Sequence, residues 1–162
     1  MEPTTERYRE EVPPPHAARE RPTERYPLVH LSADFVRAKE YLEAIVTSTS
    51  DAICTTDTDG RVIYFSPGAE RMLGMSAREA MGQPAHSFYA GGVPEAKAIM
   101  GLLRKQGSGA NREMVFRTKD GRHIHVSMSA SLLKDRTGRV IGTLGISKDI
   151  TDRIELEQRL RE

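Results

Sequence analysis

The 162-residue chain has no tryptophan and a single cysteine, Cys54. One cysteine excludes an internal disulfide framework and suits a reducing cytoplasm. The net charge of +1 argues against a broad electrostatic attraction to nucleic acid or to an anionic membrane. No apolar run is long enough to cross a bilayer, and the charged N-terminus does not resemble a signal peptide. We therefore expect a soluble, cytoplasmic protein that binds neither nucleic acid nor membrane.

Core-forming side chains are scarce in residues 1–30. This stretch holds six of the nine prolines and eleven charged residues, with few aliphatic ones. It cannot bury enough apolar surface to offset the entropy lost on ordering, so we expect a disordered arm. Pro13-Pro14-Pro15 is by itself only a weak signal for a proline-rich partner site. The remaining length suits one domain of ordinary size.

Residues 31–48 have the pattern of an amphipathic helix. Their apolar positions recur at alternating spacings of four and three residues, as along the seam of a heptad helix. These seam positions are Leu31, Phe35, Ala38, Leu42 and Ile45. About two heptads are too few to establish a coiled coil, so two interpretations stay open. In the first, the helix packs on its own domain. In the second, it pairs with the same helix of a second chain; the predicted arm favours this one, because it leaves the helix at the periphery of the domain.

Three turns of similar composition punctuate residues 49–150. Each contains an acidic residue, a glycine and an arginine: Asp59-Gly60-Arg61, Asp120-Gly121-Arg122, and Asp135 with Gly138-Arg139. Glycine permits the positive φ that a tight reversal needs, and aspartate stabilises the turn through its side chain. Strand-like sequence flanks each turn, which predicts two strands early and three late. The predicted strands cover residues 51–57, 61–66, 113–118, a segment from 122, and 139–149.

The segment between the first two turns carries helix signals. Ser66-Pro67 reads as an N-cap followed by proline at the first helical position. Gly74 can end that helix in the left-handed conformation. Ser76 and Glu79 match a capping box for a second helix. Two further helices are predicted over residues 83–89 and 93–105.

The segment from residue 122 alternates between apolar and polar side chains. Its apolar positions are Ile124, Val126, Met128, Ala130 and Leu132. Histidine and serine occupy the other face, as expected of an antiparallel sheet with helices on one side. Gly142 and Gly145 in the closing strand suggest a bulge, or the close approach of another backbone or of a ligand.

Three segments resemble PAS sensory domains, over about residues 45–155. They are DAICTTDTDGRVIYFSPGAERMLGMSARE, REMVFRTKDGRHIHVSMS and DRTGRVIGTLGISKDIT. The resemblance implies an α+β fold, with a five-stranded antiparallel sheet carrying short helices on one face. An N-terminal amphipathic helix and a C-terminal signalling helix, residues 151–162, would flank the domain at 49–150. Many family members carry Asn where this chain has Ser66, but Ser caps a helix equally well.

The resemblance implies a sensor of a small molecule, light or redox state rather than an enzyme. Such a module relays its signal to an output such as a histidine kinase. Photoreactive flavin is disfavoured, because the light-oxygen-voltage members carry their cysteine in the central helical region and Cys54 lies in a predicted strand. Cys54 has no histidine near it in sequence and is best read as a small buried hydrophobe.

The histidines give little support for a metal or haem. Haem-binding relatives carry their iron ligand on the long central helix, and residues 93–105 contain no histidine. His86 lies just ahead of that helix. His123 and His125 share one face of a predicted strand, but no third metal ligand is evident. A solvated or dimer-facing surface is the preferred interpretation of this pair.

Methionine is the most suggestive residue type in the domain. All six methionines beyond the initiator fall inside it, and flexible, polarizable side chains suit irregular cores and adaptable pockets. Core packing explains them, or they help to line an apolar cavity that admits a small ligand. The candidate lining residues are Met72, Phe88, Met100, Leu103, Met114, Phe116 and Met128. The sequence identifies neither the ligand nor a cofactor.

Asp149-Ile150-Thr151 is the most specific functional signal. The resemblance implies that this triplet joins the last strand to an output helix through polar contacts of Asp149 and Thr151. The helix that follows has Leu156 and Leu160 at coiled-coil spacing, although a plain terminal helix is the alternative. We expect a dimeric sensory module that relays a ligand signal to a kinase or other output domain. The alternative is a ligand-free module of the same fold that mediates dimerisation or protein interaction.

Overall fold

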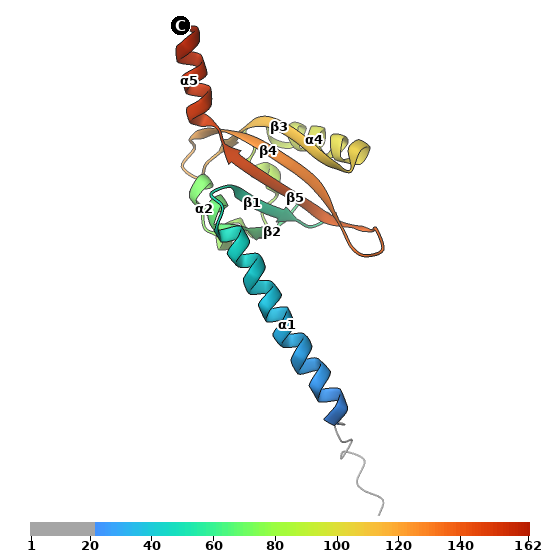
Figure 1. The fold of residues 1–162 in the computed structure, drawn as a ribbon. Helices are drawn as coiled ribbons and strands as arrows, with labels where there is room; N and C mark the ends of the chain where they lie inside the picture. The colour runs from blue at the N-terminus through green and yellow to red at the C-terminus, as the bar shows by residue number, and fades with distance from the viewer. Residues whose placement is uncertain (1–21) are drawn as a thin grey trace, which may run out of the picture. The chain divides into compact units, whose positions relative to one another are not determined.

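The computed structural model describes residues 22–162 (Figure 1). Most of the arm predicted over residues 1–30 lies outside these residues. The helices are α1 (Pro22–Thr47), α2 (Pro67–Leu73), α3 (Ala77–Ala80), the 3-10 helix η1 (Ala85–Phe88), α4 (Gly92–Gln106) and α5 (Thr151–Arg161). The strands are β1 (Ala52–Thr56), β2 (Val62–Phe65), β3 (Ser108–Arg117), β4 (His123–Lys134) and β5 (Val140–Asp149). Residues 42–162 form one compact unit, and the chain before them belongs to another.

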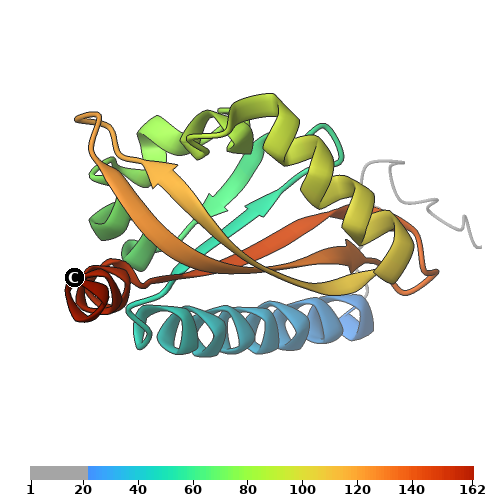
Figure 2. The ribbon, with the colours of Figure 1, turned by 90° about the horizontal axis from the view of Figure 1, so that it is seen from above.

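The five strands form a single antiparallel sheet in the order β2-β1-β5-β4-β3. The last strand of the sequence therefore lies in the middle, between β1 and β4. Figure 2 shows α4 and the shorter helices on one side of the curved sheet. This arrangement confirms the predicted α+β fold, a five-stranded sheet with helices on one face.

The predicted caps account for the short helices. Ser66 accepts a hydrogen bond from the Ala69 amide at the start of α2, and Gly74 ends that helix at a φ of 68°. Ser76 and Glu79 form the expected capping box at α3. These confirmed features are local, because each depends on residues within one or two helical turns of each other.

The core lies between the helices and the inner face of the sheet. Along β4 the apolar positions from Ile124 to Ala130 are buried, down to 0% exposure for Val126, and Leu132 is half-buried, while His123 and Ser129 on the other face are exposed. From the helical side, Leu73 of α2 and Leu103 of α4 pack into the same buried cluster. The alternation read from the sequence therefore separates the two faces of β4 correctly.

Two elements begin earlier than the sequence predicted. Helix α1 begins at Pro22, whereas the sequence predicted disorder up to residue 30 and a helix from Leu31. A charged composition does not by itself prevent a helix, because Glu and Arg have good helix propensity. Strand β3 begins at Ser108 rather than at Glu113, because the twelve-residue β4 supplies a partner for that polar stretch.

Gly142 of β5 lies beside the end of β1, one residue before Thr143, which pairs with Thr56. A Cβ built at this position would fall on the carbonyl oxygen of Thr56. This is the close backbone approach that glycine in the closing strand suggested. At Gly145 a Cβ would meet the Met128 sulfur at 3.8 Å, which is ordinary contact. The two glycines of β5 therefore differ in how strictly they are required.

Within residues 22–162, no helix combines the length and apolar character needed to span a bilayer.

Candidate ligand pocket and signal junction

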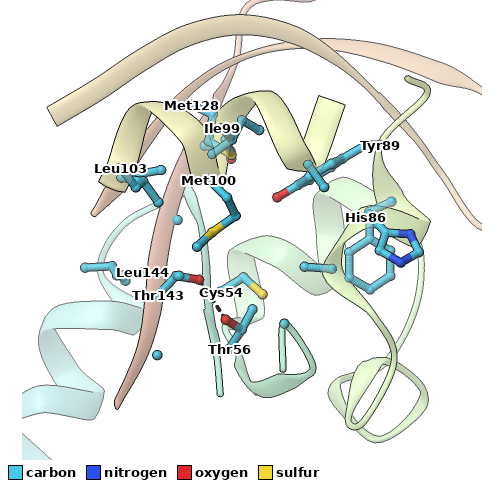
Figure 3. A pocket seen from close by; sticks show the side chains of 18 of the residues that line it. Cys54, Thr56, His86, Tyr89, Ile99, Met100, Leu103, Met128, Thr143 and Leu144 are labelled. Atoms are coloured by element: carbon cyan, nitrogen blue, oxygen red, sulfur yellow. Dashed lines mark hydrogen bonds between the residues drawn. The ribbon is translucent and has the colours of Figure 1, made fainter. Parts of the chain in front are cut away.

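A pocket of about 670 Å³ lies between α4, η1 and the inner side of β1 and β5 (Figure 3). Helix α4 lines it with side chains spaced three or four residues apart, including Met100 and Leu103. This spacing places them on one face of the helix. Met128 from β4 and Phe65 from β2 add further apolar surface. A cavity of this size and lining is typical of a site for a small organic molecule.

The structure brings together most of the predicted pocket residues. The members that line the pocket are Phe88, Met100, Leu103, Phe116 and Met128. Met72 and Met114 do not line it, which corrects the predicted set. Met72 instead borders a smaller hollow with Asp149, because the 100° step of the helix turns Leu73 toward the pocket and Met72 away. Met114 is buried in the core of the sheet at 6% exposure.

Tyr89 contributes an aromatic ring and a hydroxyl group to the pocket. Its ring stacks on Phe116 with centroids 5.7 Å apart and an interplanar angle of 14°. Its hydroxyl points into the pocket on the side of Met100 (Figure 3). Burial raises the pKa of Tyr89 to about 12, with smaller contributions from Cys54 and Glu95. The phenol is therefore protonated at neutral pH.

Cys54 projects from β1 into the same pocket. Burial raises the pKa of its thiol to about 11, so the reactive thiolate is scarce at neutral pH. Beyond it, the hydroxyls of Thr56 and Thr143 are 2.7 Å apart and hydrogen-bond to each other across β1 and β5. Thr56 also donates to the carbonyl of Asp57 at 2.9 Å. These groups make the β1–β5 wall polar but electrically neutral.

Charged side chains occur where the pocket meets solvent. Lys97 and Arg104 of α4 and Asp59 of the β1–β2 turn line the pocket and are all exposed. Asp57 is half-buried, and its carboxylate accepts hydrogen bonds from the amides of Asp59 and Arg61 in its own turn. The interior and the rim of the pocket therefore differ in charge.

Sequence reasoning missed the polar lining of the pocket. Ala52, Cys54 and Thr56 are spaced two residues apart and so lie on one face of β1, and a period-two reading of that strand would have found them. Tyr89 directly follows Phe88, a residue that was predicted. His86, set aside as a haem ligand because it precedes the long helix, also lines the pocket. No signal in the sequence indicated that Thr143 lines the pocket, because its hydrogen-bond partner Thr56 lies 87 positions away.

The triplet Asp149-Ile150-Thr151 lies where β5 leads directly into α5 (Figure 1). The Asp149 carboxylate accepts a hydrogen bond from the Thr151 amide at 2.9 Å. The Thr151 hydroxyl accepts one from the His125 amide of β4 at 3.1 Å. Ile150 is 7% exposed and donates its amide to the His125 carbonyl at 2.9 Å. The start of α5 is thus tied to two strands at once.

The seam of α1 presents apolar side chains to solvent. Phe35, Leu42 and Ile45 are 70%, 60% and 50% exposed. The side chain of Leu31 lies outside the described residues. Single exposed apolar side chains are common in folded proteins, but a helical row of them is typical of an interaction surface.

The two histidines of β4 remain without a third metal ligand. His123 is exposed and His125 is half-buried. Within the described part of the chain, no three His, Cys, Asp or Glu side chains gather closely enough to hold a metal ion.

The chain belongs to the PAS domain family, whose model matches residues 50–152. It is 27% identical to the signal transduction histidine-protein kinase AtoS of Escherichia coli (strain K12) over 74% of this chain and 19% of that protein. It is also 27% identical to the sensor protein kinase WalK of Staphylococcus haemolyticus, over 76% of this chain and 19% of the kinase. The chain thus spans about a fifth of the length of these relatives.

Solved structures show the same fold. A PAS domain from Colwellia psychrerythraea matches with a TM-score of 0.65 and 27% identity, covering 71% of this chain and 98% of that one. An RNA-binding light-oxygen-voltage receptor matches with a TM-score of 0.65 and 24% identity, covering 76% of this chain and 36% of that one. The chain is therefore a PAS signalling module related to the input domains of histidine kinases.

Proposed function

We propose that this PAS domain is a cytoplasmic sensor whose pocket binds a small, mostly apolar ligand. The observation that carries the proposal is the pocket itself, about 670 Å³ in volume and lined by Met100, Leu103 and Met128. Apolar burial on this scale favours an organic ligand without any charged anchor. The flexible methionine side chains let the wall adapt to the shape of the ligand.

We further propose that ligand binding is relayed through Asp149-Ile150-Thr151 to α5. Strand β5 supports this route, because its residues 142–145 line the pocket and its end forms the junction. Thr151 and Ile150 each bond to His125, so a shift of β5 against β4 would change the direction in which α5 leaves the sheet. A packed sheet transmits such small displacements because it has little free volume.

The output that we propose for α5 is a histidine kinase or another signalling domain. AtoS and WalK are both kinases, and the matched part is only 19% of each. Kinase activity in those proteins would therefore lie outside the segment shared with this chain. The PAS domain would act by setting the geometry of the helix that enters its partner domain.

We propose that the chain is a homodimer through the exposed seam of α1. Leu42→Glu should yield a folded monomer, because burying glutamate charges in an apolar seam is costly. Sedimentation velocity measures the mass, and far-UV circular dichroism checks the fold. Lys39→Glu, a charge change off the seam, is the control and should leave the dimer intact. Unmodified protein that is monomeric at tens of micromolar would refute this assembly.

A larger side chain inside the pocket should prevent ligand binding. Ala96 and Ala98 both lie on α4, but Ala96 lines the pocket and Ala98 is exposed. We expect Ala96→Phe to weaken binding of the apolar probe diphenylmethane at least ~10-fold, since the new ring competes for the same volume. Ala98→Phe should bind as the unmodified protein does. Protein-observed NMR titration gives the dissociation constants.

Two results would contradict the ligand proposal. Equal binding to Ala96→Phe and to the unmodified protein would place the probe elsewhere on the molecule. Absence of binding to the unmodified protein would favour the alternative function, a PAS domain that only sets dimer geometry.

A further inference from the structure

The Tyr89 side chain is held in a fixed position. Its ring stacks on Phe116, and the two residues also pair as an isolated β-bridge. The backbone around Tyr89 is also held by hydrogen bonds. The Tyr89 amide donates to the His86 carbonyl at 3.1 Å, and the Ala90 amide donates to the Val115 carbonyl at 2.9 Å. A ring fixed at its base and along its face presents its hydroxyl at a defined point, with little entropy left to lose on binding.

The Tyr89 hydroxyl has no hydrogen-bond partner among the described residues. No fully buried side-chain oxygen or nitrogen in this part of the chain lacks a partner, so the hydroxyl must be reached by solvent. It points into the pocket (Figure 3), so the pocket is the route by which water reaches it. A ligand that fills the pocket displaces this water. The O–H group then loses its acceptor unless the ligand supplies one.

Three other polar side chains of the β1–β5 wall, those of Cys54, Thr56 and Thr143, are already engaged or are weak donors. The Thr56 and Thr143 hydroxyls bond to each other, and Thr56 donates to the Asp57 carbonyl. The Cys54 thiol is a weak donor and lies 3.9 Å from the Thr55 carbonyl. Among these groups, the Tyr89 hydroxyl is the strong donor left for a ligand.

The placement of charge excludes a charged group deep in the pocket. Lys97, Arg104 and Asp59 are exposed at the rim, and the carboxylate of Asp57 is used within its own turn. The ionised group whose charge reaches Tyr89 and raises its pKa is Glu95, but its carboxylate already pairs with Arg112 at 3.3 Å. Cys54 and Tyr89 are themselves protonated at neutral pH. An ionic group placed there would lose its hydration without gaining a counter-ion.

We propose that the pocket selects neutral, largely apolar molecules carrying a hydrogen-bond-accepting oxygen, such as a ketone, which the Tyr89 hydroxyl binds. This inference rests on the proposed ligand-binding function and specifies the chemical class of the ligand. Apolar burial provides most of the affinity, and the single hydrogen bond provides the discrimination.

Two probes of nearly the same shape test this selection. Benzophenone has a carbonyl where diphenylmethane has a CH₂ group. Dissociation constants are measured by NMR titration of the full chain, for the unmodified protein and for Tyr89→Phe, which keeps the ring stacked on Phe116. Tyr64→Phe is the matched control, because Tyr64 of β2 does not line the pocket.

We expect the unmodified protein and Tyr64→Phe to bind benzophenone about five- to tenfold more tightly than diphenylmethane. Tyr89→Phe should bind the two probes equally, with diphenylmethane binding unchanged. Equal binding of both probes to the unmodified protein, or a carbonyl preference that survives in Tyr89→Phe, would overturn the inference and leave the ligand-binding function standing. Failure of both probes to bind at the pocket would overturn both.

Discussion

Replacing Gly142 by alanine is expected to lower the melting temperature of the domain by roughly 10–20 °C. The added Cβ would fall on the Thr56 carbonyl oxygen, and neither group lies on a flexible side chain. The backbones of β1 and β5 would have to separate at this point. That separation would also break the hydroxyl contact between Thr56 and Thr143 in the pocket wall. The cost, ~3 kcal/mol, is a large part of the stability of an ordinary domain.

Gly145→Ala is the matched control for this prediction. It lies on the same strand, and its Cβ would make only ordinary contact with Met128 at 3.8 Å. Calorimetry or thermal circular dichroism of both variants should show a large loss for Gly142→Ala and little change for Gly145→Ala. Similar melting temperatures for the two variants would mean that β1 and β5 are not packed as closely as described.

Ser66→Ala should produce the second large effect, a loss of about 2–4 kcal/mol in the free energy of unfolding. The Ser66 side chain is fully buried, and its oxygen accepts hydrogen bonds from the Ile53 amide at 2.9 Å and the Ala69 amide at 3.1 Å. One bond caps α2 and the other joins that helix to β1. Alanine would leave both buried donors without an acceptor, which costs more than the loss of one exposed cap.

Ser76→Ala separates capping from this second role. Ser76 caps α3 with the same side-chain chemistry, but it is exposed and water can replace its hydroxyl. We expect it to cost about 1 kcal/mol in urea unfolding. If Ser66→Ala costs no more than Ser76→Ala, then the bond to Ile53 contributes nothing and Ser66 is only a helix cap.

The helical part of the domain could be predicted because its signals are local. The helix caps formed by Ser66, Gly74 and the Ser76–Glu79 box each involve residues only a few positions apart. They can therefore be recognised in the sequence before the fold is known. The start of β3 could not be predicted in this way. Its first residues are Ser-Gly-Ala-Asn, which read as a loop, and they become a strand because β4 lies beside them.

The pocket was predicted in outline but not in its chemistry. Apolar residues of α4 follow helical spacing, so Met100 and Leu103 could be assigned to the inner face. The Thr56–Thr143 contact joins residues 87 positions apart, and no pattern within either strand indicates it. The orientation of Tyr89 depends on stacking against Phe116 of a distant strand, so its role also required the tertiary structure.

The central claim, that the pocket and α5 are coupled through the junction, can be tested by one NMR measurement on the full chain. Benzophenone is titrated into the unmodified protein and into Thr151→Val, which keeps the side-chain shape and removes the oxygen that accepts from His125. In the unmodified protein, we expect amide resonances to shift both around the pocket and along Thr151–Arg161. In Thr151→Val the pocket shifts should persist while those of α5 fall to less than about half, since one of the ties between α5 and β4 is gone. Resonances of α5 that do not respond in the unmodified protein, or that respond equally in Thr151→Val, would contradict the account.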